Sequence, residues 1–180
     1  GSMGIQVRKE DYNNNYIEPY PHLLLLSNKD GNLKESNENI IDDNNGNGML
    51  CGFAHDASAG DIDNDGDIDV VVLNTREAPT ILRNDSSTSN HWVRIQLEGT
   101  QSNREAIGAR IKLIAGELTL IDELKSGRGY QSHYGTLSHF GLGQEKKIDQ
   151  VEIWWPSGKK QIFKNIPVDR VVKFTEDRTR

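Results

Sequence analysis

The stretch GDIDNDGDIDVVVLN, Gly60–Asn74, brings five aspartates together directly before an apolar strand. Counted from the first of them, the aspartates occupy positions 1, 3, 5, 7 and 9, and a glycine occupies position 6. They are Asp61, Asp63, Asp65, Asp67 and Asp69. Like charges this close repel one another unless a cation neutralises them, and Ca²⁺ accepts about six to eight oxygen ligands at flexible angles. The spacing therefore predicts a calcium-binding loop that leads into a β-strand.

Each aspartate has an expected role in this loop. Four of them are expected to supply side-chain oxygens to one Ca²⁺, and Asp67 its backbone carbonyl. The four are Asp61, Asp63, Asp65 and Asp69. Gly66 permits the sharp bend that returns the second half of the loop, because glycine adopts positive φ without strain. Mg²⁺ fits this pattern less well, since it dehydrates reluctantly and takes few carboxylates.

Two other interpretations of the aspartates are an EF-hand and a solvated acidic turn. An EF-hand needs a bidentate glutamate at about position 12 and flanking helices. Here that position is Val72, inside an apolar strand. The remaining alternative is a solvated acidic turn that binds no ion. The regular spacing of carboxylates around Gly66 favours the calcium loop over that alternative.

The rest of the chain alternates apolar and polar residues with a period of about two, which is typical of half-buried strands. HLLLLS and NLKES flank the turn signal Asp30-Gly31 and predict a hairpin. WVRIQLEGT, from Trp92, predicts a half-buried strand in which Val93, Ile95 and Leu97 share one face. No amphipathic helix pattern stands out. We therefore expect an all-β protein.

A second hairpin is predicted near the C-terminus. VEIWW and KQIFKNI flank Pro156-Ser157-Gly158, in which proline presets φ at the second turn position and glycine accepts positive φ. Along VEIWW, Ile153 and Trp155 point to one face of the strand and Trp154 to the other. We expect Trp155 to lie in the core and Trp154 to be exposed.

Two parts of the chain resemble known families. AGDIDNDGDIDVVVLN followed by PTILRND resembles an FG-GAP or VCBS-type repeat, the calcium-loop repeat of integrin-like β-propellers, and PHLLLLSNKDGNLKES resembles the outer half of a preceding repeat. REAIGARIKLIAG, SGRGYQSHYGTLSHFGLG and DQVEIWWPSGKKQ are similar to the ASPIC/UnbV domain. The resemblance implies the C-terminal part of a cartilage acidic protein-like secreted protein, with no catalytic residues.

These observations predict three regions and a fold. Residues 1–18 are expected to be a disordered tail that begins with an expression scar, Gly1-Ser2-Met3. Residues 19–88 are expected to form a partial β-propeller repeat with the calcium loop between strands, and residues 89–180 a C-terminal β-sandwich. Because one repeat and a fraction cannot close a propeller, we expect free edges on the strands Leu23–Leu26 and Val70–Leu73. The C-terminal domain or a second copy of the chain would cover them.

The charge, the apolar runs and the motifs of the sequence limit the classes of partner and of reaction that we expect for this chain. The net charge of −6 argues against nucleic acid and anionic membranes, and no apolar run approaches the roughly 18 residues that span a bilayer. A nucleophile triad is not predicted, because no G-x-S-x-G elbow occurs and serine and histidine are common in turns. The candidates for such a triad are Ser126, Ser132, Ser138, His133, His139 and Asp122. Nor do His55 and His91 have the spacing of zinc ligands.

The sequence therefore predicts a secreted, calcium-binding, non-enzymatic module for extracellular adhesion or protein interaction. We expect it in the extracellular space or the periplasm, with an extracellular protein or a glycan as its partner. The alternative is a carbohydrate-binding module of a larger secreted protein, in which Trp154 would stack on a sugar ring.

Overall fold

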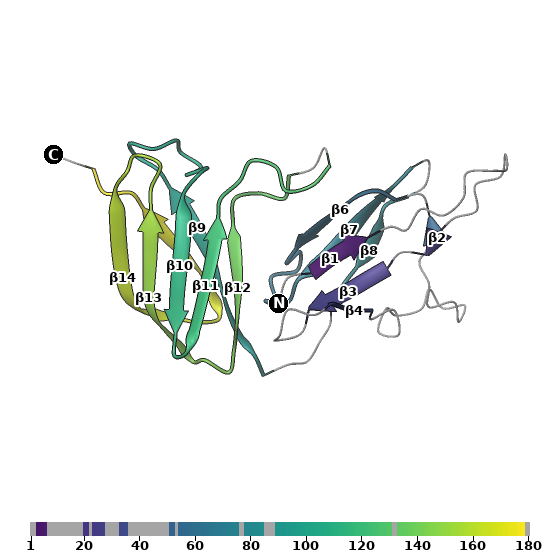
Figure 1. Ribbon diagram of the computed structural model, residues 1–180, viewed down its shortest axis with the longest axis horizontal. Helices are drawn as coiled ribbons and strands as arrows, with labels where there is room; N and C mark the ends of the chain where they lie inside the picture. The colour runs from purple at the N-terminus through teal and green to yellow at the C-terminus, as the bar shows by residue number, and fades with distance from the viewer. Residues whose placement is uncertain are drawn as a thin grey trace. The chain divides into compact units, whose positions relative to one another are not determined.

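The computed structural model describes residues 3–6, 20–21, 23–27, 33–35, 51–52, 54–75, 78–84, 89–130 and 133–178, with side chains from His55 onward. All regular structure in these ranges is β-strand, as the sequence predicts (Figure 1). None of the described residues belongs to a helix that is long and apolar enough to cross a membrane. The strands form two compact units. The first contains β1 to β8, and the second contains β9 to β15 and the loop Asp61–Ile68.

The N-terminal strands of the first unit form a three-stranded and a two-stranded sheet. They are β1 (Met3–Gln6), β2 (Tyr20–Pro21), β3 (Leu23–Ser27), β4 (Leu33–Glu35) and β5 (Cys51–Gly52). The antiparallel pair β3–β4 confirms the predicted hairpin, although its turn lies outside the described residues. Within the region predicted to be a disordered tail, Met3–Gln6 pairs with β3. The other residues of that tail lie outside the described ranges.

The strand that follows the aspartates is the middle strand of a second three-stranded sheet. β7 (Asp69–Asn74) pairs antiparallel with β6 (Ala54–Gly60) and with β8 (Thr80–Leu82). Val70 and Val72 are buried, whereas Leu73 is 46% exposed on the other face. The predicted free edge on Val70–Leu73 is therefore wrong. The same holds for β3, which pairs with a strand on each side.

The second unit consists of two sheets. Its strands are β9 (His91–Glu98), β10 (Arg110–Ala115), β11 (Leu118–Glu123), β12 (Ser138–Gly143), β13 (Lys147–Trp154), β14 (Lys160–Pro167) and β15 (Arg170–Thr175). The four-stranded sheet has the order β11-β10-β13-β14, and the three-stranded sheet has the order β12-β9-β15 (Figure 1). β9 lies in the middle of the smaller sheet, antiparallel to β12 and parallel to β15.

Both sheets contribute to one hydrophobic core. Alternate residues of β9 and β10 point into it, with Ile95 and Leu113 both fully buried. The other core residues are Val93, Leu97, Ala106, Ala109, Ile111, Ala115, Leu124, Phe140, Leu142, Ile148, Val151, Ile153, Trp155 and Phe174. Because side chains alternate along a strand, the residues that alternate with the core residues of β9 face outward. Among them are Trp92 and Arg94.

The C-terminal hairpin follows the prediction. β13 and β14 pair antiparallel, and the backbone N–H of Gly158 donates to the carbonyl of Trp155 across the turn at 2.9 Å. Gly158 has a φ of 88°, which glycine adopts at no steric cost. Trp155 is 3% exposed and Trp154 is 37% exposed. The assignment of the two rings to opposite faces is confirmed.

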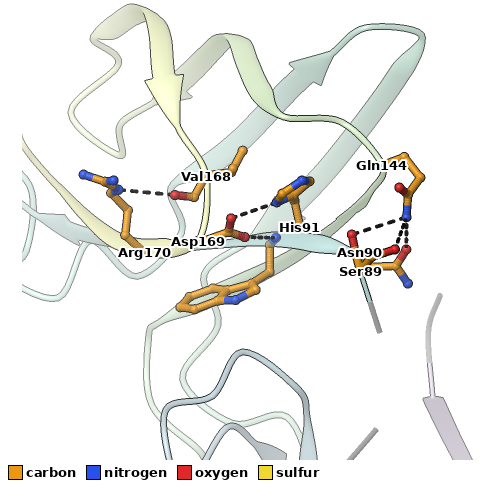
Figure 2. Close-up of polar contacts among 8 residues, drawn as sticks. Ser89, Asn90, His91, Gln144, Val168, Asp169 and Arg170 are labelled. Carbon is orange, nitrogen blue, oxygen red and sulfur yellow. Dashed lines mark hydrogen bonds and ion pairs between the residues drawn. The ribbon is translucent and has the colours of Figure 1, made fainter. Parts of the chain in front are cut away.

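A residue of the turn between β14 and β15 forms hydrogen bonds with the start of β9 (Figure 2). Asp169 has a φ of 58°, and its carboxylate accepts a hydrogen bond from the backbone N–H of Trp92 at 3.2 Å. Its other oxygen lies 2.7 Å from Nδ1 of His91, and its own N–H donates to the carbonyl of Trp92 at 2.7 Å. On the chain just before β9, the amide of Gln144 donates to Oδ1 of Asn90 at 2.9 Å. The backbone of Trp92 is therefore held firmly.

Candidate metal centre

The loop between β6 and β7 is tightly curled by its own aspartates. The N–H of Asp67 donates to Oδ1 of Asp65 at 2.9 Å, and the N–H of Asp65 lies 3.4 Å from Oδ1 of Asp63. Such side-chain-to-backbone bonds two residues apart are the ordinary way in which aspartate forms a turn. Asn64 and Gly66 have φ values of 64° and 102°, which are left-handed backbone conformations. The expected positive φ of Gly66 is confirmed.

Three of the five aspartates converge. Ligand oxygens of Asp61, Asp63 and Asp65 all lie within 4.8 Å of one another. Asp63 and Asp65 are exposed, whereas the side chain of Asp61 is 0% exposed. Oδ1 of Asp61 is buried and has no hydrogen-bond partner among the residues that the structure describes. A buried carboxylate oxygen without a partner is costly, and a hydrogen-bond donor or a bound cation would remove that cost.

The other two predicted ligands lie differently. Asp67 was expected to use its carbonyl, and its carboxylate is not one of the three that converge. Asp69 is 1% exposed, and its Oδ1 accepts a hydrogen bond from the backbone N–H of Asn84 at 2.8 Å. That bond ties the first residue of β7 to the segment after β8. The roles of Asp67 and Asp69 as calcium ligands stay predictions.

Gly66 lies against an aromatic ring. A methyl group on its Cα would be 2.0 Å from Nε1 of Trp92, far inside van der Waals contact. Two independent constraints therefore demand glycine at this position, namely the positive φ and the close approach of the indole. The sequence predicts the first constraint through the bend. It contains no sign of the second, because Trp92 comes from the neighbouring sheet.

Arg94 is the residue of the centre that the sequence analysis missed. Its Nη1 donates to Oδ2 of Asp61 and to Oδ1 of Asn64, each at 3.0 Å. The N–H of Gly66 donates to the same Oδ2 of Asp61 at 3.2 Å. Both donors thus engage Oδ2 of Asp61, and neither of them engages Oδ1. The only signal in the sequence is that Arg94 alternates with core residues and must face outward.

Two of the described candidates for a catalytic triad, Ser138 and Asp122, form a hydrogen bond with each other. Oγ of Ser138 donates to Oδ2 of Asp122 at 2.6 Å, and Arg128 donates to both oxygens of that carboxylate. His139 follows Ser138 on β12 and therefore points to the opposite face, where it stacks on Trp92 with the ring centroids 6.0 Å apart. Burial, and secondarily the charge of Arg94, lowers the pKa of His139. Ser132 lies outside the described residues.

The comparison with protein families bears on the second unit. Residues 99–180 match the family model described as ASPIC and UnbV. The matched segment covers β10 to β15, which are all but one of the strands of the two sheets in the second unit. The remaining strand is β9, which precedes the match and yet lies in the middle of the smaller sheet. A search of curated proteins finds no match to the chain.

The match therefore confirms one of the two resemblances. The ASPIC and UnbV region begins right after β9, the strand that bears Trp92 and Arg94. Both of these side chains contact the aspartate loop. The resemblance of the first unit to an FG-GAP or VCBS-type repeat stays a prediction.

Proposed function

We propose that this protein is a calcium-binding, non-enzymatic module for adhesion or protein interaction outside the cell. The observation that carries the proposal is the buried Oδ1 of Asp61, which has no hydrogen-bond partner in the described part of the chain and belongs to a carboxylate that converges with those of Asp63 and Asp65. The donor set consists of hard oxygens, which suit Ca²⁺ and exclude the soft metals that prefer sulfur. The residues present therefore fit the ion that the spacing predicts.

In this proposal the three converging aspartates hold one face of the ion. Asp69 contributes a side-chain oxygen from the first residue of β7, and Asp67 contributes its carbonyl. Calcium would neutralise the carboxylates and fix the point where the loop enters β7. We further propose that the first unit is a partial propeller repeat of the FG-GAP type, and that the two sheets of the second unit form a β-sandwich, which their shared core supports.

Calcium is expected to raise the melting temperature of the protein, and EDTA to reverse the rise. Extracellular modules bind Ca²⁺ with a Kd of about 10⁻⁴–10⁻³ M, and saturation at roughly 100 times Kd contributes about 2.7 kcal/mol to folding. Asp63→Ala should abolish the shift, because it removes one of the three converging carboxylates. Differential scanning calorimetry with and without calcium measures both effects.

Asp67→Ala is the matched control for this experiment. It removes the same charge from the same loop, but the predicted ligand at this position is the backbone carbonyl, which alanine retains. The shift should therefore persist in Asp67→Ala. Equal melting temperatures of the wild type in calcium and in EDTA would refute the proposal, and so would loss of the shift in Asp67→Ala alone.

One observation favours the second candidate function, a carbohydrate-binding module. Trp154 and Ile162 are 37% and 51% exposed, and the register of β13 and β14 places them on the same outward face of the larger sheet. Nζ of Lys160 lies 4.6 Å from the centroid of the Trp154 ring. An exposed indole beside polar side chains is a common platform for sugar rings.

A glycan array separates the two functions. If the module binds carbohydrate, one class of polysaccharide should bind in a saturable manner, and Trp154→Ala should weaken that binding at least tenfold, which is about 1.4 kcal/mol. Leu73→Ala is the control, because it removes an exposed apolar side chain of β7 in the first unit. An array without saturable signals would leave protein interaction as the function, and saturable binding that survives Trp154→Ala would contradict the role of Trp154 in carbohydrate binding.

A further inference from the structure

We propose that Arg94 is a built-in cation of the aspartate loop that holds the loop together without calcium and weakens calcium binding when the ion arrives. This inference rests on the proposed calcium site and names the residue that tunes it. A side chain of β9 would then set the calcium affinity of a loop whose ligands are all supplied by the aspartate stretch.

The geometry of Arg94 supports this role. One nitrogen of its guanidinium bridges Asp61 and Asn64, so it clamps the first and fourth residues of the loop. Its side chain is only 14% exposed and faces a carboxylate that is 0% exposed. An ion pair shielded from water in this way is screened far less by salt than a surface pair.

The position of Arg94 is also fixed. It lies on β9, the middle strand of its sheet, where it is opposite His139 on β12 and Val171 on β15. Strands on both sides hold its backbone, and the guanidinium is a cationic group. When calcium binds, this cation therefore stays beside the loop.

The positive charge of Arg94 determines whether this residue strengthens or weakens calcium binding. Oδ2 of Asp61 faces Arg94, and Oδ1 of the same carboxylate is the buried atom at the proposed calcium site. A calcium ion at Oδ1 would share one carboxylate with the guanidinium, and the two positive charges repel at that separation. Arg94 therefore stabilises the calcium-free loop more than the calcium-bound loop. By linkage, its removal must tighten calcium binding.

Arg94→Met tests this sign. Isothermal titration with calcium chloride should show a Kd about tenfold lower than in the wild type. Repulsion between two positive charges at this separation is enough to change Kd by at least that factor. In EDTA the variant should melt at a lower temperature than the wild type, so the rise in melting temperature upon calcium addition should be larger. An unchanged or higher Kd in the variant overturns the inference.

Three further variants separate charge from geometry. Arg94→Gln keeps a hydrogen-bond donor without the charge and should also bind calcium more tightly, which makes it the test if Arg94→Met does not fold. Arg94→Lys keeps the charge and should stay near the wild-type Kd. Lys173→Met removes a cation from the same sheet, where it pairs with Glu98 away from the loop, and should leave the Kd unchanged.

The calcium titrations of the wild type and of the Arg94 variants test two different proposals. A wild-type protein that takes up no calcium refutes the proposed function itself. A wild-type protein that binds calcium, with Arg94→Gln and Arg94→Met binding no more tightly, refutes only the role of Arg94.

Discussion

Truncation of Trp155 to alanine is expected to lower the free energy of unfolding by about 3–5 kcal/mol, the usual cost of removing a buried indole from a core. Trp155 is 3% exposed and belongs to the core shared by the two sheets of the second unit. Its Nε1 is buried and has no hydrogen-bond partner among the residues described, so we attribute the contribution to packing. Urea unfolding followed by circular dichroism measures the loss.

Trp154→Ala is the matched control, because it makes the same substitution one residue earlier. Trp154 is 37% exposed on the opposite face, so its loss should be clearly smaller than that of Trp155→Ala. The comparison isolates burial from the chemistry of the side chain. Similar losses in the two variants would contradict the assignment of the rings to opposite faces.

The local features of the fold could be predicted because they depend on neighbours in the sequence. The turn at Pro156-Ser157-Gly158 depends on the φ preferences of its own residues, and the faces of Trp154 and Trp155 follow from strand alternation. The convergence of Asp61, Asp63 and Asp65 belongs to the same class, because a curled loop brings odd-numbered side chains together. None of these features needs a distant segment.

Features that join distant segments could not be predicted in the same way. Arg94 bonds to Asp61 across 33 positions of the chain, and nothing in WVRIQLEGT distinguishes an arginine over a loop from an arginine in water. The pairing of β1 with β3 was missed for a related reason, because MGIQ is too short to show alternation. The parallel pairing of β15 with β9 likewise depends on the closing of the whole second unit.

Glu176 is another feature that sequence reasoning missed. It follows β15 in a polar C-terminal segment, yet it is 1% exposed. Its Oε2 accepts hydrogen bonds from the backbone N–H groups of Thr100, Gln101 and Ser102 at 2.8–2.9 Å. Oγ atoms of Ser102 and Ser157 donate to its Oε1. One carboxylate thus joins the end of β9, the β13–β14 turn and the end of β15.

These bonds hold the carboxylate in its charged form. Burial alone would raise the pKa of Glu176, but the hydrogen bonds from Ser157 and from the three backbone N–H groups lower it from 4.5 to about 2. Because the folded pKa lies below the unfolded pKa, the stabilisation is fully present above 4.5 and is lost as the pH falls toward 2. A shift of this size corresponds to about 3 kcal/mol.

Glu176→Gln is therefore expected to lower the free energy of unfolding by about 3 kcal/mol at neutral pH. The amide keeps the shape of the side chain but loses the negative charge to which five donors bind. The difference in unfolding free energy between wild type and variant should shrink as the pH is lowered from 4.5 toward 2, since the wild-type carboxylate is then protonated as well. Urea unfolding followed by the fluorescence of the three tryptophans, all of which belong to β9 and the β13–β14 hairpin, measures this difference. Glu117→Gln, a change at an exposed position of the β10–β11 turn, should match the wild type at every pH. A loss in Glu176→Gln that stays constant across this pH range would mean that shape, and not charge, accounts for the contribution of Glu176.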